Sequence, residues 1–366
     1  MCGFGTYRWY SMKQSIRSYI LNFIIILGFT AAVLWFALKD NFHSIMELIG
    51  NIPFLWLFVI LGWGIVYAGV IGLILTVLTR RYHKQYTFLK GFQNALVGYF
   101  FSGITPSATG GQFAQAYILK KQGIKLAEGA SILWADFIIY QTVMMVYVTV
   151  LFLMRSAYYM EIVGTWFWAI IVGYLVNVGV IALLWTMALF PKLYVWLSQR
   201  MVSLLAKLHL VKDKEKTLLN WKLQVEGFTN EIKQIRHEHR LIVKAVLLNV
   251  LRMTIQLTLP FVIARSLGLP LGWDKLIDSM ALASFVLMVN AFFPVPGASG
   301  GTEFAFTQLY IFLVGPGAAA SSIMILWRFS TYHIVLIAGA FVFLYLKHRY
   351  DNEKYKKQAI IKEVTS

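Results

Sequence analysis

Five ionisable residues stand within long apolar stretches of the chain: Asp136, Arg252, Glu303, Arg328 and His333. Ionisable side chains are costly at membrane depth, so each is a candidate for binding, ion pairing or proton transfer. Asp136 and Arg328 follow two similar Trp-containing segments, and a purely structural pairing of the two is as open as a functional role. We interpret His333 as a residue of a packing interface or a cavity.

Glu303 has the most informative surroundings of the five. It follows Gly300, Gly301 and Thr302, and Ser299 comes directly before these. One interpretation is a carboxylate that is stabilised by the N-terminal end of a helix dipole. The interpretation that we favour is a site for a lipid headgroup or a proton in the middle of the membrane, because a carboxylate there is expensive and polar groups flank it.

Two glycine pairs are predicted to begin half-helices, in residues 110–115 and 300–305. The N-terminus of a helix offers unpaired N–H groups to an anion such as a lipid phosphate, with Arg252 or Arg328 as the countercharge. The alternative is that these glycines only allow close helix packing. The candidate substrate-binding residues are Asp136, Arg252, Glu303 and Arg328, together with Gly110, Gly111, Gln112, Ser299, Gly300, Gly301 and Thr302.

The composition indicates an integral membrane protein. Of the 366 residues, 59% are hydrophobic and 13% are charged, whereas soluble domains carry about 25% charged residues. The net charge is +17, and most of the basic residues lie in loops between apolar runs. In that position they determine the orientation of the chain in the membrane and contact anionic lipids, so they do not indicate binding of nucleic acid. Cys2 is the single cysteine, and no P-loop, HExxH or nucleophile-elbow motif occurs. The sequence therefore predicts no metal, no cofactor and no catalytic site.

Eight apolar segments are long enough to enter the hydrocarbon layer. They cover residues 18–38, 54–79, 91–119, 129–153, 166–190, 241–264, 276–315 and 317–346. Segments 91–119 and 276–315 differ from the rest because Pro and Gly interrupt them, in GITPSATGG at 103–111 and PVPGASGG at 294–301. A continuous helix does not tolerate such runs, so we expect breaks that are buried in protein or line a wet cavity.

The distribution of basic residues indicates which loops lie on the cytoplasmic side of the membrane, because cytoplasmic loops carry an excess of Lys and Arg. They gather before the first span, on both sides of segment 91–119, in the loop at 191–240 and in the C-terminal tail. The opposite loops hold only Lys39, Arg155, Arg265 and Lys275. This distribution predicts two cytoplasmic termini, six full spans and two re-entrant helical hairpins of opposite orientation. Eight kinked crossings are the alternative, and they would place Lys120 and its neighbours outside.

The two interrupted segments also resemble each other. At an offset of 190 residues, Pro106 matches Pro296, and Gly110-Gly111 matches Gly300-Gly301. Two similar units in opposite orientation form an inverted repeat, an architecture typical of transporters. We therefore expect an all-α membrane protein with a first repeat at 1–190, an amphipathic basic linker at 191–240 on the inner membrane surface, a second repeat at 241–346 and a basic tail at 347–366.

Two motifs carry a resemblance to a known family. FFPVPGASGGTEFAF at 292–306, with WRF at 327–329, and SATGGQFAQAYILKKQGI at 107–124 resemble the lysylphosphatidylglycerol synthase transmembrane-region family. The resemblance implies translocation of an aminoacylated phospholipid or a glycolipid between leaflets. Gln112 departs from the acidic residue that many members carry there, and Ala135-Asp136 departs from an acidic-Arg pair, which leaves the substrate open.

We therefore expect a flippase-like lipid transporter of the bacterial cytoplasmic membrane, with membrane lipids as partners. A homodimer and a separate lipid-modifying enzyme are further partners that the sequence allows. We expect no lysyltransferase activity, because residues 347–366 are too few for an aminoacyltransferase domain. The remaining alternatives are a lipid-binding protein without transport and a secondary transporter for a small solute. Residues 1–11 are interpreted as an extension upstream of Met12.

Overall fold

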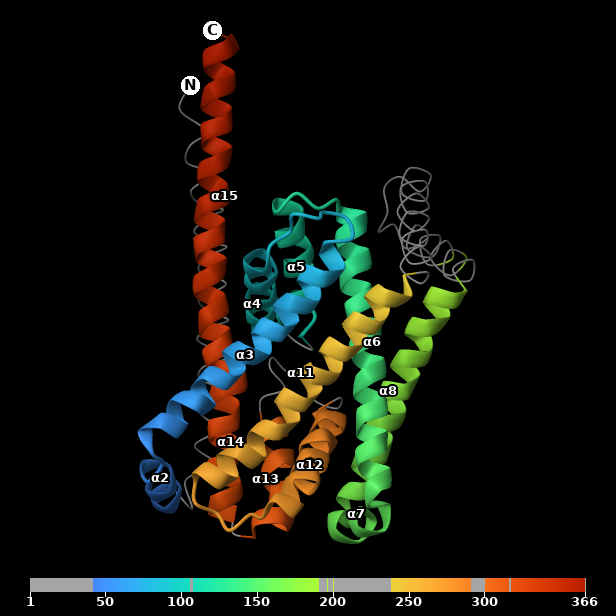
Figure 1. The fold of residues 1–366 in the computed structure, drawn as a ribbon, viewed down its shortest axis with the longest axis vertical. Helices are drawn as coiled ribbons and strands as arrows, with labels where there is room; N and C mark the ends of the chain where they lie inside the picture. Colours follow the sequence, from blue (N-terminus) through green and yellow to red (C-terminus); the bar gives the residue numbers. More distant parts are fainter. Residues whose placement is uncertain are drawn as a thin grey trace.

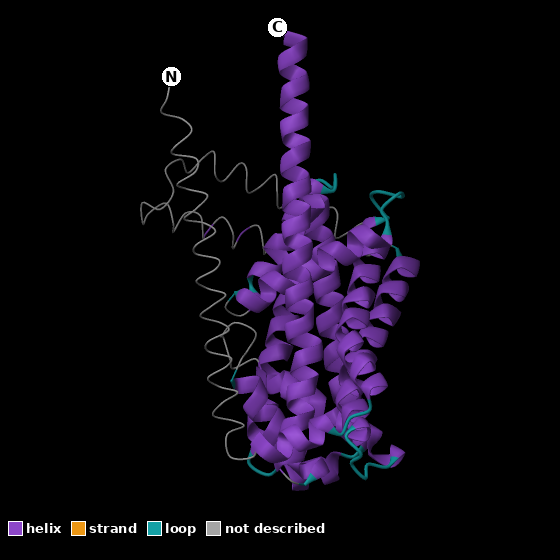
Figure 2. Ribbon diagram, turned by 90° about the vertical axis from the view of Figure 1, so that its left-hand side faces the viewer, coloured by secondary structure: helices purple, strands orange, loops and turns teal. Residues whose placement is uncertain are grey.

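The computed structural model describes residues 42–105, 108–190, 196, 200, 238–290, 300–315 and 317–365. Figure 1 shows the described residues as a bundle of helices, beyond which the C-terminal helix projects. Figure 2 shows no strand in this part of the chain. The expectation of an all-α protein is confirmed for these residues.

Five helices are long and apolar enough to cross a membrane. They are α3 (Phe54–Thr79), α6 (Leu126–Met154), α8 (Trp166–Leu189), α11 (His239–Ser266) and a final helix built from α14 (Gly317–Arg328), the π-helical turn η5 (Phe329–Ile334) and α15 (Val335–Thr365). They correspond to five of the six expected full spans. The expected span at 18–38 lies outside the described residues.

The two interrupted segments each form a pair of shorter helices. Segment 91–119 becomes α4 (Phe88–Ile104) and α5 (Gly110–Lys121), and segment 276–315 becomes α12 (Leu276–Val289) and α13 (Gly301–Val314). Within each pair the two helices pack against each other. Figure 1 shows the α4–α5 hairpin in the upper part of the bundle and the α12–α13 hairpin in the lower part. The chain thus folds back on itself near the predicted Pro-Gly interruptions, whose residues 106–107 and 291–299 are not described.

Two short helices, α2 (Phe42–Gly50) and α7 (Ser156–Val163), lie at the lower end of the bundle in Figure 1. The 3-10 turn η2 (Trp273–Lys275) connects α11 to α12. The loops at 80–87 and 122–125 lie at the upper end. Of the expected amphipathic linker, only Trp196, Arg200 and residues 238–240 are described. The place of this linker on a membrane surface therefore stays a prediction.

The packing pattern of the first half recurs in the second. Helix α3 packs against α4 and α6, and α11 packs in the same way against α12 and α14. The first hairpin reaches α6 through α5, as the second reaches α14 through α13. Helices α3 and α11 also pack against each other, and Figure 1 shows them running through the middle of the bundle. The order of a long helix, a hairpin and a long helix matches the internal repeat seen in the sequence.

The outer surface of the long helices is apolar. Leu55 on α3 is 75% exposed, and Trp168 on α8 and Phe341 on α15 are each 70% exposed. Helices that are apolar on all sides are typical of a membrane environment, because lipid chains replace the water that would oppose such exposure. The described part of the chain is therefore that of a multi-span membrane protein.

The two halves approach each other closely where α3 meets η5. A Cβ atom on Gly64 would lie 2.0 Å from the carbonyl oxygen of Ser330. The Ser330 hydroxyl accepts a hydrogen bond from the Gly64 N–H group at 3.1 Å and donates one to the carbonyl oxygen of Ile60. Small residues allow this kind of backbone contact in membranes. Gly64 and Ser330 therefore join the first long helix of one repeat to the last span of the other.

Candidate functional site

Glu303 and Arg328 form a buried ion pair. The Arg328 Nε atom donates to Glu303 Oε1 at 2.7 Å, and the side chains are only 8% and 3% exposed for Arg328 and Glu303. The pair joins α13 to the C-terminal end of α14. The Arg328 guanidinium also lies 4.8 Å from the centre of the Tyr332 ring, one turn further along the same helix. Two residues of the predicted site thus meet inside the protein.

The second carboxylate oxygen of Glu303 closes the start of α13. It accepts a hydrogen bond from the Gly300 N–H group at 2.6 Å, and Gly300 has a φ angle of +87°, which favours glycine. The carboxylate thus caps the helix and interacts favourably with its dipole. Thr302 donates to Asn290 Oδ1 at 2.9 Å and so connects the start of α13 to the end of α12. Ser299 lies outside the described residues.

Arg252 is the centre of a second polar cluster, between α3, α6 and α11. Its guanidinium lies 4.0 Å from the centre of the Tyr140 ring. Its Nε atom donates to the Tyr67 hydroxyl at 3.2 Å, and its Nη1 atom donates to Asn249 Oδ1 at 3.5 Å. Asp136 lies beside Arg252 and Asn249, but its Oδ1 atom is buried without a hydrogen-bond partner among the described residues. This cluster therefore holds a guanidinium, aromatic faces and one unused carboxylate oxygen.

The start of α5 is built for close packing. The Gly110 N–H group donates to Thr105 Oγ1 at 2.9 Å, and a Cβ atom on Gly111 would lie 1.9 Å from Ser102 Oγ and 2.8 Å from the Gly98 carbonyl oxygen. Gln112 is exposed. For Gly110 and Gly111 the close-packing interpretation thus has direct support from the geometry. In the second hairpin the Gly300 N–H group is occupied by Glu303 in the same way.

The four charged candidates form two clusters, each with one carboxylate and one guanidinium. The sequence left a pairing of Asp136 with Arg328 open, and this pairing is wrong: Arg328 binds Glu303 within its own repeat, and Asp136 lies beside Arg252 of the other repeat. The ring of His333 packs against Tyr332 and lies 3.2 Å from the carbonyl oxygen of Arg328. No group of three or more His, Cys, Asp or Glu side chains that could hold a metal occurs in the described part of the chain.

Asp278 is a charged residue that the sequence analysis missed. It is 1% exposed, on the first turn of α12. Its Oδ2 atom accepts from Arg155 at 2.6 Å and lies 3.5 Å from the Lys275 Nζ atom, and its Oδ1 atom accepts from the Tyr159 hydroxyl at 3.0 Å. Burial and the neighbouring Asp278 carboxylate raise the pKa of Tyr159, so its phenol stays protonated and donates. Asp278 follows shortly after the polar sequence WDK at 273–275. Because residues near such a polar segment usually face water, nothing in the sequence indicated that Asp278 is buried.

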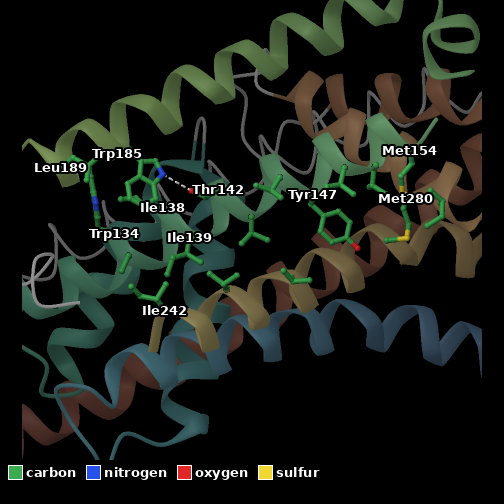
Figure 3. A pocket seen from close by; sticks show the side chains of 18 residues that line it. Trp134, Ile138, Ile139, Thr142, Tyr147, Met154, Trp185, Leu189, Ile242 and Met280 are labelled. Atoms are coloured by element: carbon green, nitrogen blue, oxygen red, sulfur yellow. Dashed lines mark hydrogen bonds between the residues drawn. The ribbon is translucent and has the colours of Figure 1, made fainter. Parts of the chain in front are cut away.

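A long apolar groove runs along α6, between α8, α11 and the start of α12 (Figure 3). Its volume is about 610 Å³. The one hydrogen bond drawn across its lining joins Trp185 Nε1 to Thr142 Oγ1 at 3.2 Å. The lining residues are Trp134, Ala135, Ile138, Ile139, Thr142, Val143, Val146, Tyr147, Val150, Leu151, Met154, Trp185, Leu189, Ile242, Val246, Val250, Ile277 and Met280.

Comparison with known families agrees with this architecture. The model of the lysylphosphatidylglycerol synthase TM region matches residues 19–339 of the 366-residue chain. The match contains both hairpins and both charged clusters. No curated protein matches the chain significantly. The chain belongs to the lysylphosphatidylglycerol synthase transmembrane-region family.

Proposed function

We propose that this protein binds the polar headgroup of a membrane lipid at its two buried charged clusters and moves that lipid between the leaflets of the bacterial cytoplasmic membrane. The observation that carries the proposal is the ion pair between Glu303 and Arg328, buried at the inner end of the α12–α13 hairpin. A buried ion pair contributes little to stability compared with an apolar pair of similar volume, because both ions must leave water. A role in binding accounts for its presence.

The proposed topology follows from the arrangement of the two hairpins. Helices α4 and α5 both have their outer ends at the upper end of the bundle in Figure 1, with the loops that carry Arg80, Lys84 and Lys125. Helices α12 and α13 have theirs at the opposite end. We propose that both hairpins are re-entrant, one from the cytoplasm and one from outside, and that both termini are cytoplasmic. Their tips then meet the hydrocarbon layer near its middle.

The two clusters suit a headgroup that carries both signs of charge. A lipid phosphate would bind a guanidinium of Arg328 or Arg252, and an ammonium group would bind the carboxylate of Glu303 or the unused Oδ1 atom of Asp136. An aminoacylated phospholipid such as lysylphosphatidylglycerol has both groups, and a glycolipid phosphate has one of them. The acyl chains would stay in the surrounding lipid. In this proposal the chain transports the lipid and does not aminoacylate it.

Leaflet exchange in reconstituted vesicles tests the proposal. The informative variant is Glu303→Gln with Arg328→Met, because it removes both charges and leaves no lone buried ion. Vesicles with wild-type protein are expected to exchange fluorescent or aminoacylated lipids faster than empty vesicles, and vesicles with the double variant are expected to match empty ones. Equal exchange with wild-type protein and with no protein would refute transport. Lipid binding without exchange would favour a receptor for lipids.

A further inference from the structure

The apolar groove on α6 ends beside two basic residues. Met154 and Ile277 line the groove at its lower end, and Arg155 and Lys275 stand one and two residues away from them along the chain. The two cations share the single buried carboxylate of Asp278. Each of the two cations therefore has only a share of one carboxylate. The side chains of Arg155 and Lys275 are 42% and 36% exposed, so both cations are available at the surface.

The aromatic ring of Tyr158 holds these cations together. The Arg155 guanidinium lies 4.4 Å from the centre of the ring, and the Lys275 ammonium lies 5.8 Å from it. Tyr159 on the same short helix α7 binds the Asp278 carboxylate. The basic pair is therefore fixed by α7 and by the start of α12, and it does not depend on either charged cluster of the proposed transport site.

The groove is open to the surroundings of the bundle. Val146 and Val150 line it and are 59% and 53% exposed. From Thr142 to Met154 the groove follows thirteen residues of α6, and the twelve steps between them cover about 18 Å at the helical rise. One leaflet of the hydrocarbon core is about 15 Å thick, half of the full thickness. The section between the Thr142–Trp185 hydrogen bond and the basic pair thus has the length of one acyl chain.

We propose that this section of the groove, with Arg155 and Lys275 at its end, is a binding site for an anionic phospholipid. The lipid phosphate binds the two exposed cations, and one acyl chain lies along α6 between α8 and α11. Two exposed cations that share one carboxylate favour an anionic headgroup over a zwitterionic one. In the predicted topology this end of the bundle faces outwards, so the lipid belongs to the outer leaflet. The site goes beyond the proposed transport function and does not require it.

Native mass spectrometry of the full chain in detergent tests the site, with phosphatidylglycerol and phosphatidylcholine as the two probes. Wild-type protein is expected to bind phosphatidylglycerol more tightly. The variant Arg155→Gln with Lys275→Gln and Asp278→Asn removes both cations and leaves no lone buried carboxylate. It is expected to bind phosphatidylglycerol roughly thirtyfold more weakly, since each basic residue near a membrane surface contributes about fivefold.

A second variant tests the groove without touching the charges. Val150→Trp fills the section that the acyl chain would occupy, and it is expected to lower phosphatidylglycerol binding at least tenfold. Leu247→Trp is the matched control, because Leu247 on α11 is 62% exposed and does not line the groove. Its binding is expected to equal that of wild type. The transport variant Glu303→Gln with Arg328→Met is also expected to bind phosphatidylglycerol normally, which separates this site from the transport site.

Three results would overturn the proposal. The first is equal affinity of the wild-type chain for both probes. The second is unchanged phosphatidylglycerol binding in the Val150→Trp variant. The third is a dimer in the native spectra that Val150→Trp abolishes and Leu247→Trp does not, because a second copy of the chain would then cover the groove.

Discussion

Glu303 is held by two partners of different kinds. One carboxylate oxygen pairs with the Arg328 guanidinium, and the other accepts the Gly300 N–H group at the start of α13. The same side chain therefore satisfies a buried cation on the last span and an otherwise unpaired backbone donor of a helix. Any headgroup that displaces Arg328 from Glu303 acts on the start of this half-helix as well.

The energetics of this pair give a first prediction, on stability. Glu303→Gln leaves the buried Arg328 without its countercharge and is expected to cost about 3 to 5 kcal/mol of unfolding free energy. The double variant Glu303→Gln with Arg328→Met is expected to regain most of this loss. Thermal unfolding in detergent measures both. A single variant that is as stable as wild type would show that Arg328 reaches water or another partner.

Arg252 supports a second prediction, because aromatic rings surround it. Tyr140→Phe keeps a ring 4.0 Å from the guanidinium, and Tyr140→Leu removes it. The loss of a cation–π contact is expected to cost about 0.5 to 2 kcal/mol, the upper end applying to a desolvated pair. Tyr140→Leu is therefore expected to lower both the unfolding temperature and the rate of leaflet exchange, whereas Tyr140→Phe stays near wild type. Equal behaviour of the two variants would assign no role to the ring.

The partners of these residues were harder to predict from sequence than the residues themselves. The free-energy cost of placing a charged side chain in the hydrocarbon layer was enough to identify Asp136, Arg252, Glu303 and Arg328 as candidates. Their pairing depends on the rotation of each helix about its axis, which an evenly apolar helix does not encode. Asp136 and Arg328 looked equivalent in sequence, but equivalent residues of an inverted repeat lie in different halves. Tyr67 and Tyr140 reach Arg252 from two other helices, and no spacing in the sequence connects them.

At the scale of helices, close backbone contacts hold the hairpins and spans together. The contact of α3 with η5 gives a third prediction through two glycines of the same helix. A Cβ atom on Gly64 would lie 2.0 Å from a backbone oxygen, whereas a Cβ atom on Gly62 would meet nothing within 4 Å. Gly64→Ala is expected to destabilise the protein by about 1 to 3 kcal/mol. Gly62→Ala is expected to be neutral or to stabilise it by up to about 1 kcal/mol.

Thermal unfolding of the two alanine variants side by side checks this prediction. Since both substitutions lie on α3 and add the same methyl group, a difference between them reports the close contact of Gly64 with Ser330 and Val335. If both variants unfold at the wild-type temperature, the close contact between α3 and η5 contributes nothing to stability.

The helices themselves could be predicted well from composition. The apolar run at 54–79 coincides with α3, and the runs at 129–153 and 241–264 lie within α6 and α11. Long apolar runs are easy to recognise because only a helix satisfies its own backbone in lipid. Pro and Gly also placed the two interruptions. The groove on α6 could not be predicted, because it arises from the separation of α8 and α11, which the sequence of either helix does not determine.

At the scale of the whole molecule, the hairpins of the two halves open towards opposite ends of the bundle. In Figure 1 the α4–α5 hairpin opens upwards and the α12–α13 hairpin opens downwards. The basic loops at 80–87 and 122–125 lie at the upper end. The connections from α6 to α7 and from α11 to α12, which carry Arg155, Arg265 and Lys275, lie at the lower end. Both outer ends of α4–α5 lie at the same end of the bundle, which is the reason why we propose re-entrant hairpins rather than eight kinked crossings.

Cysteine labelling in intact cells provides a fourth prediction, on topology. Cys2 is the single cysteine, so the Cys2→Ser variant contains no cysteine. Single cysteines can then be introduced into it one at a time for labelling. Lys84→Cys and Lys121→Cys are expected to resist a membrane-impermeant maleimide until the cells are opened. Glu161→Cys on α7 is expected to react from outside. If Lys84→Cys and Lys121→Cys react from opposite sides, the eight-crossing topology is correct.

The π-helical turn at Phe329–Ile334 accommodates one extra residue between the two parts of the last helix. A π-turn holds one residue more than an α-helical turn in the same full rotation, whereas one residue of regular α-helix corresponds to about 100° of rotation. Gly339 on α15 would carry a Cβ atom 2.3 Å from the carbonyl oxygen of Leu96 on α4, so this glycine must face α4. Deleting one residue from this turn would convert it to regular α-helix with little change of rotational phase, so Arg328 would stay beside Glu303 and Gly339 would stay against α4. Deleting one residue from the regular helix between the turn and Gly339, in residues 335–338, would instead swing Gly339 away from α4. That deletion should therefore be far less tolerated than a deletion within the π-turn, a pattern that a deletion scan of the last helix would reveal.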